Sequence, residues 1–190
     1  MQKPVMRKMH KNLVDLNLDD LKKCLPEQLQ KQSVTAVLLA LGSNYQADTH
    51  LPHVRKRLAT LGQIQLSTAF QNPDFTASLE QPKPDYTNQC VYIALTPAMT
   101  LQQLQQTFKQ YERECHRQRS TERQTPVKKV TMDIDILLIQ TVLNKNSLSD
   151  KQTSKPSRQW IIMADRYPLK AHETAGVKEL IADASSTVAP

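Results

Sequence analysis

The chain has 190 residues and a formal charge of +7, with 25 lysine and arginine residues against 18 aspartate and glutamate residues. This length suits one domain with a proper core rather than two, and the positive charge favours an anionic partner, either a nucleotide or a nucleic acid. Because no apolar stretch is long enough for a membrane span or a signal peptide, we expect a cytoplasmic protein that does not bind a membrane.

The numbers of cysteine and glycine residues limit the kinds of metal, disulfide and phosphate-binding site that the chain can form. The three cysteines are widely spaced and form no C-x-x-C pair, so neither a zinc site nor a disulfide framework is indicated. Only three glycines are present, which excludes a glycine-rich phosphate loop. Any phosphate binding must therefore use side-chain cations.

The first 33 residues form a polar, basic extension in which residues 18–29 predict an amphipathic helix broken by Pro26. This extension either packs on the domain or stays mobile. We expect a single domain over residues 34–184 and a frayed tail over residues 185–190.

The domain begins with an apolar strand over residues 34–41, stopped by Gly42-Ser43-Asn44. A helix follows, with Ser43, Asn44 or Asp48 as its N-cap and Gly62 at its end. Residues 64–70 predict a second strand. The proline-containing stretch 71–84 is typical of a functional loop, and a third strand covers residues 89–95.

The longest helix begins at Thr96-Pro97, or at Thr100 with Gln103 as a capping box. Its buried stripe consists of apolar residues at helical spacing: Leu101, Leu104, Phe108, Tyr111 and Cys115. A fourth strand covers residues 131–139, residues 160–163 form an edge strand or buried loop, and residues 173–182 form a last helix.

This order, strand, helix, strand, strand, helix, strand, is the split βαβ pattern. It predicts an α+β, ferredoxin-like sandwich in which helices cover an antiparallel sheet of at least four strands.

The fourth strand carries the strongest chemical signal. Side chains alternate along a strand, so Asp133 and Asp135 share one face, about 7 Å apart. Such a pair is suited to Mg²⁺ held jointly by carboxylates and substrate phosphates, although a strand end whose aspartates simply face water is the alternative. The preceding residues 113–129 contain six cations, which suit a polyphosphate or merely form a solvated basic loop.

Four pieces of the chain, in this order, resemble the 6-hydroxymethyl-7,8-dihydropterin pyrophosphokinase family of folate biosynthesis. They are Ala40-Leu41-Gly42-Ser43-Asn44, Pro84-Asp85-Tyr86-Thr87-Asn88, Tyr111-Glu112 with Arg117 and Arg119 beyond it, and Asp133-Ile134-Asp135-Ile136-Leu137. The resemblance implies attack of a pterin hydroxymethyl oxygen on the β-phosphorus of ATP, with release of AMP.

The resemblance also implies roles for individual residues. Asp133 and Asp135 would bind two Mg²⁺ ions and, with Arg117, Arg123 and Lys129, would form the catalytic set. The ATP side would comprise Glu112, Arg119, Lys128 and Ile134, and the pterin side Tyr86, Asn88 and Trp160. The implied partners are ATP and a pterin alcohol, bound by a monomer or a small homo-oligomer.

Two other interpretations stay open at this point. Val130 stands where the family usually has an arginine, which leaves Lys128 or Lys129 to supply the charge and is compatible with a homologue that binds ATP or pterin without turnover. A basic α+β module that binds RNA is the third interpretation, disfavoured because the predicted strands offer few aromatic side chains. Nucleic acid is thus an unlikely partner.

Overall fold

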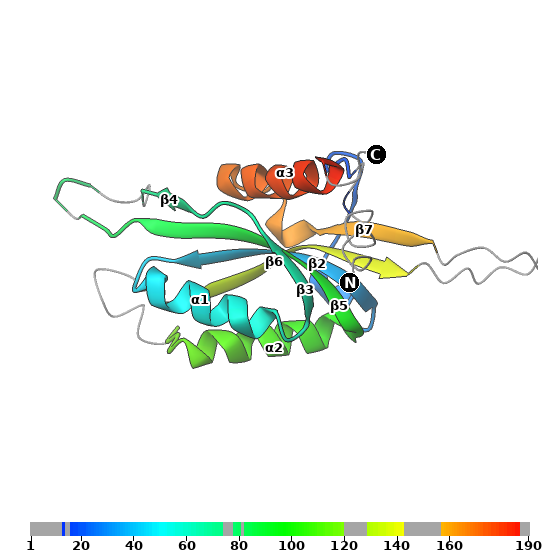
Figure 1. Ribbon diagram of the computed structural model, residues 1–190, viewed down its shortest axis with the longest axis horizontal. Coiled ribbons are helices and arrows are strands. Elements are labelled where there is room, and N and C mark those ends of the chain that lie inside the picture. Colours follow the sequence, from blue (N-terminus) through cyan, green and yellow to red (C-terminus); the bar gives the residue numbers. More distant parts are fainter. Residues whose placement is uncertain are drawn as a thin grey trace, which may run out of the picture.

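The computed structural model describes residue 13 and residues 16–73, 78–80, 82–119, 129–142 and 157–186. These residues form a seven-stranded sheet with α1 and α2 on one face and α3 on the other (Figure 1). The strands are β1 (Lys22–Cys24), β2 (Ser33–Ser43), β3 (Gly62–Leu66), β4 (Phe70–Asn72), β5 (Tyr86–Thr100), β6 (Asp133–Val142) and β7 (Arg158–Met163). The helices are α1 (Ala47–Leu58), α2 (Leu101–Glu114) and α3 (Ala171–Ser186), with short 3₁₀ segments η3 (Pro26–Gln28) and η4 (Ala164–Arg166).

The middle of the sheet confirms the predicted α+β class. Its strands lie in the order β6-β2-β5-β3 with antiparallel pairing throughout, and α1 and α2 make the two crossovers of the split βαβ pattern. Two more strands, β7 and β1, extend the sheet beyond β6. The expected antiparallel sheet of at least four strands is therefore confirmed, and the parallel pairing of β1 with β7 makes the complete sheet mixed at this edge.

The central strand β2 is apolar on both faces because both faces are covered. Val37, Leu39 and Leu41 pack in the core beneath α1 and α2, whereas Leu38 and Ala40 pack in the core beneath α3. The apolar strand predicted over residues 34–41 is therefore confirmed, and its alternate side chains meet different layers of helices.

The long helix α2 agrees closely with prediction. Thr100 is its N-cap and forms the capping box with Gln103, and all five residues of the expected stripe are buried. The expected cap of α1 is wrong: Gln46 occupies that position in a left-handed conformation and no side chain caps the helix. Asn44 is used elsewhere, since its Oδ1 accepts a hydrogen bond from the backbone N–H of Val130 at 2.6 Å.

Several other boundaries also differ from prediction. The helix expected over residues 18–29 is replaced by β1 and η3, because pairing with β7 satisfies the backbone of that segment. The strand expected over residues 64–70 is interrupted between β3 and β4, while β5 runs well beyond the expected 89–95. Strand β7 is flanked by β1 and β6, so it is not the edge strand that was one of the two predictions for residues 160–163.

Helix α3 lies very close to the sheet at Gly176. A Cβ atom at this position would be 2.7 Å from the Cys90 Sγ atom, so only glycine fits without a shift. This close approach of α3 to β5 brings the first turn of α3 beside the beginning of β6, where the two aspartates lie.

Candidate active site

Strand β6 begins at Asp133 and presents both aspartates on the face directed toward α3. Ile134, between them, points into the core under α1 and α2 and is 8% exposed. The side chains of Asp133 and Asp135 keep 35% and 31% of their surface exposed. The predicted alternation of carboxylate and apolar side chains is thus confirmed at this strand.

A cavity of about 500 Å³ opens along both aspartates. Tyr86 and Asn88 contribute to its wall from β5, Arg117 and Val130 from the segments on either side of residues 120–128, and His172 from the first turn of α3. Burial lowers the pKa of His172, so its imidazole is neutral near pH 7.

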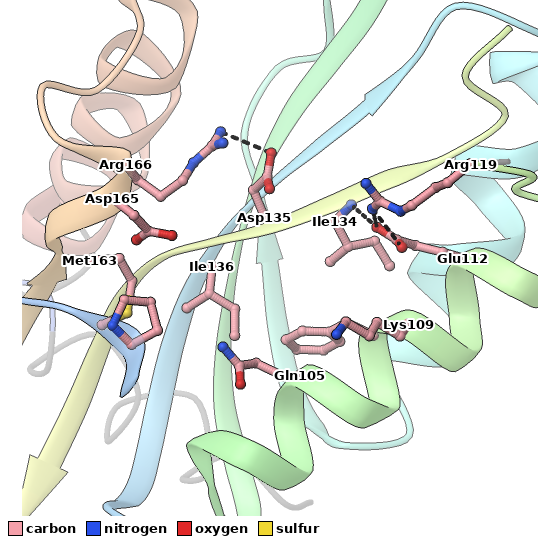
Figure 2. Close-up of a pocket in the computed structure, with 12 residues that line it drawn as sticks. Gln105, Lys109, Glu112, Arg119, Ile134, Asp135, Ile136, Met163, Asp165 and Arg166 are labelled. Carbon is pink, nitrogen blue, oxygen red and sulfur yellow. Dashed lines mark hydrogen bonds and ion pairs between the residues drawn. The ribbon is translucent and has the colours of Figure 1, made fainter. Parts of the chain in front are cut away.

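A second cavity, of about 240 Å³, lies against Asp135 on the side of α2 (Figure 2). Gln105, Lys109 and Glu112 contribute from α2, and Arg119 and Arg166 bring two guanidinium groups. Asp135 lines both cavities, which places a carboxylate at their common wall.

Glu112 joins α2 to β6 at the second cavity. Its Oε1 accepts a hydrogen bond from the backbone N–H of Ile134 at 3.0 Å, and both its oxygens accept from Arg119 Nη2, at 3.1 and 2.9 Å. Burial raises the pKa of Glu112, while the hydrogen bonds from Arg119 and Ile134 act in the opposite direction. The carboxylate therefore fixes the main chain between the two aspartates.

Both aspartates have arginine partners. Arg119 Nη2 lies 3.0 Å from Asp133 Oδ1, and Arg117 Nη2 lies 3.9 Å from the same oxygen. Asp135 Oδ2 is 2.8 Å from Arg166 Nη2. Two carboxylates so close together are thereby balanced by guanidinium groups.

The environment of Asp135 favours its neutral form. Burial is the main cause and the negative charge of Asp133 adds to it, so the pKa of Asp135 rises to about 6 although Arg166 acts in the opposite direction. Because burial and the charge of Asp133 destabilise the ionised form of Asp135, a bound divalent cation would stabilise that form.

The structure brings most of the predicted site residues together. Grouped around the two cavities are Tyr86, Asn88, Glu112, Arg117, Arg119, Asp133, Ile134 and Asp135. Trp160 lies elsewhere: it is 8% exposed, packs against Tyr92 with ring centroids 6.3 Å apart, and pairs with Gln140, five positions beyond Asp135 on β6.

Three of the predicted cationic site residues are not seen at either cavity. The Nζ of Lys129 lies 4.8 Å from the centroid of the Tyr45 ring, and Lys129 lines neither cavity. Arg123 and Lys128 lie outside the described residues.

Sequence reasoning missed Arg166 and Glu173, which lie at the site. The available signal was their position on either side of Tyr167-Pro168-Leu169, in a segment with no periodic pattern to interpret. Arg166 pairs with Asp135 and Glu173 pairs with Arg166, and both contacts depend on how η4 and α3 fold back beside β6.

The two aspartates fit a hard divalent cation such as Mg²⁺. They supply oxygen ligands that are partly exposed at a cavity wall. No group of three or more His, Cys, Asp or Glu side chains in the described part of the chain could hold a metal by itself. A cation here would complete its coordination with substrate oxygens and water, which is usual for Mg²⁺ beside phosphates.

An acidic pair among arginines, between two cavities, defines a site suited to phosphoryl-type transfer between two substrates. The sequence model of the 7,8-dihydro-6-hydroxymethylpterin-pyrophosphokinase (HPPK) family matches residues 38–160. This match covers more than half of the chain, which therefore belongs to the HPPK family, pterin pyrophosphokinases of folate synthesis that generally use ATP and Mg²⁺.

No individual curated protein matches the chain. Among the described helices, none has both the length and the apolar character needed to cross a membrane.

Proposed function

We propose that this chain transfers pyrophosphate from ATP to the hydroxymethyl group of 6-hydroxymethyl-7,8-dihydropterin in a Mg²⁺-dependent reaction that releases AMP. The observation that carries the proposal is the position of Asp135 at the wall shared by two cavities of different character. A transfer between two substrates requires such a meeting point, with charge neutralisation at the reacting phosphorus.

The larger cavity is assigned to the pterin. Its volume of about 500 Å³ lies within the usual range for small-molecule sites. The Tyr86 ring offers a flat apolar surface, and the Asn88 amide both donates and accepts hydrogen bonds, as the edge of a pterin requires. The pterin hydroxymethyl group would then point toward Asp133 and Asp135.

The smaller cavity is assigned to ATP. Arg119, Arg166 and Lys109 bring positive charge to it, and Glu112 holds Arg119 in place. Guanidinium groups bind phosphate oxygens with paired N–H donors, so they compensate for the missing glycine-rich loop. Arg123 and Lys128 remain predicted contributors on the ATP side.

In the proposed reaction the hydroxymethyl oxygen forms a bond to the β-phosphorus while the bond from that phosphorus to the α-phosphate oxygen breaks. The hydroxyl proton passes to water and AMP leaves. Two Mg²⁺ ions, held by Asp133 and Asp135, would supply charge neutralisation of the transferring phosphates. The chain itself orients the two substrates so that the hydroxymethyl oxygen faces the β-phosphorus.

The test measures AMP by chromatography after incubation with ATP, Mg²⁺ and the pterin alcohol. We expect AMP with the wild type and a loss of at least about a hundredfold in Asp133→Asn and in Asp135→Asn, because each removes a metal-binding charge. Asp183→Asn, on an exposed part of α3, is the matched control and should retain full activity. Unchanged AMP formation in both site variants would overturn the assignment.

A homologue that binds substrates without turnover is the second candidate. The observation in its favour is Val130, which lines the pterin cavity, is 3% exposed, and stands where the resemblance leads one to expect an arginine. Tight binding of a non-hydrolysable ATP analogue with no AMP from a folded sample, unchanged in Val130→Arg, would favour this candidate.

The RNA-binding interpretation finds little support in the sheet. Helices cover both of its faces in Figure 1, and the aromatic side chain of Tyr92 is fully buried. Bases that stack on a sheet need an open face with exposed aromatic side chains.

A further inference from the structure

Arg166 links the proposed metal-binding carboxylate to a buried carboxylate on α3. Its Nη2 atom lies 2.8 Å from Asp135 Oδ2 and also 2.8 Å from Glu173 Oε1. Figure 2 shows the guanidinium reaching from η4 to Asp135 across the end of the smaller cavity. One nitrogen therefore serves two carboxylates.

Glu173 is a fixed anchor. It is 2% exposed, and its second oxygen accepts a hydrogen bond from the backbone N–H of Lys170 at 2.8 Å. A buried carboxylate requires a cation, and among the described residues Arg166 is the one whose ion pair with Glu173 is seen. Arg166 is thus retained beside the site whether or not it also contacts Asp135.

A cation on Asp135 and the guanidinium of Arg166 compete for the same oxygen. Asp135 Oδ2 is already in contact with Arg166 Nη2, and two positive groups cannot share that position without strong repulsion. Binding of a divalent cation there requires Arg166 to move away from Asp135.

We propose that Arg166 is a positioning residue that exchanges partners: it neutralises Asp135 before substrate binds, and it transfers to the polyphosphate when Mg²⁺ and nucleotide occupy the site. This inference rests on the proposed function. Glu173 holds one side of the guanidinium throughout, and the remaining N–H donors of the planar fork become available to phosphate oxygens in the cavity that Arg166 lines.

The exchange predicts effects of opposite sign on two binding equilibria. Removing Arg166 eliminates a competitor for Asp135, so a divalent cation alone binds more tightly. The same change removes a phosphate ligand, so Mg²⁺ with nucleotide binds more weakly. A general structural defect would weaken both.

Two titrations measure these effects. Mn²⁺ alone, followed by electron paramagnetic resonance, reports the cation site, and calorimetry with Mg²⁺ and α,β-methylene ATP reports the nucleotide complex. For Arg166→Gln we expect Mn²⁺ to bind about threefold to tenfold more tightly and the analogue about tenfold more weakly. Arg113→Ala is the matched control: Arg113 is exposed on α2 and donates hydrogen bonds to Gln110 Oε1, so its removal should change neither equilibrium.

A second variant protects the test against misfolding, because Arg166→Gln leaves Glu173 buried without its cation. The double variant Arg166→Gln with Glu173→Gln removes both charges and should show the same pair of opposite changes. Weaker binding, or no change, in both titrations of the double variant would overturn the exchange.

The result is independent of turnover. If the wild type produces no AMP but the two titrations still change in opposite directions, the exchange stands and the proposed reaction fails. If AMP is produced but the titrations change together, the reaction stands and the exchange fails.

Discussion

Glu112 offers the sharpest test of how the active-site strand is held. In Glu112→Ala the backbone N–H of Ile134 loses its hydrogen-bond acceptor, the Glu112 Oε1 atom at 3.0 Å, and Ile134 is only 8% exposed. An unsatisfied buried N–H costs about 1–3 kcal/mol. Loss of the contact to Arg119, whose side chain is 62% exposed, adds less than about 1 kcal/mol. The free energy of unfolding should therefore fall by about 2–3 kcal/mol.

Glu112→Gln separates the two contributions. The amide oxygen of glutamine can still accept from Ile134, and only the charge paired with Arg119 is lost, so we expect a decrease below about 1 kcal/mol. Urea denaturation at neutral pH measures both variants. Glu114→Ala, on α2 like Glu112, is the control: it removes an ion pair with the partly exposed Arg57 of α1 and should leave the urea midpoint nearly unchanged. Equal losses in the alanine and glutamine variants would refute the role assigned to Ile134.

Three further predictions concern charge, packing and thiol chemistry. Because the pKa of Asp135 is raised to about 6, the contribution of this group to stability is complete below the ordinary pKa of 3.8 and is lost as pH rises through about 6. Thermal unfolding in the presence of a chelator should therefore show that Asp135→Asn gains about 1–2 kcal/mol of stability relative to the wild type between about pH 4 and pH 8. A stability difference that stays constant with pH would contradict this prediction. Gly176→Ala places a methyl group 2.7 Å from Cys90 Sγ and should lower the free energy of unfolding in urea by about 1–3 kcal/mol, whereas an unchanged midpoint would show that α3 can move outward. Burial raises the pKa of the Cys90 thiol to about 12 and of the Cys115 thiol to about 11, so both should resist a disulfide reagent at about pH 8 until urea unfolds the chain; rapid labelling of more than one thiol in the native protein would argue against this packing.

Local periodicity explains what could be predicted from the sequence. A period of two along residues 131–139 is enough to place Asp133 and Asp135 on one face, and helical spacing is enough to identify the buried stripe of α2. The capping box at Thr100 is likewise a pattern of neighbours. Each of these features is decided within about one turn of helix or a few residues of strand, so the sequence alone contains it.

Pairings between distant segments could not be predicted in this way. The 18–29 segment has the spacing of an amphipathic helix, yet Lys22–Cys24 adopts a strand because β7 offers it an unpaired edge. The family resemblance implies a pterin-side role for Trp160, whereas the register of β7 against β6 places this residue beside Gln140, away from the aspartates.

The sequence by itself determined the family, the order of the core elements and the acidic pair, because these depend on residue type and short-range spacing. Only the tertiary structure decided which charges meet at that pair. Arg166 reaches Asp135, and Glu173 holds Arg166, because η4 and α3 fold beside β6, with Gly176 allowing α3 to approach the sheet closely. Electrostatic partners are set by distances in space, and a sequence pattern fixes the face on which a side chain lies without fixing what it will face.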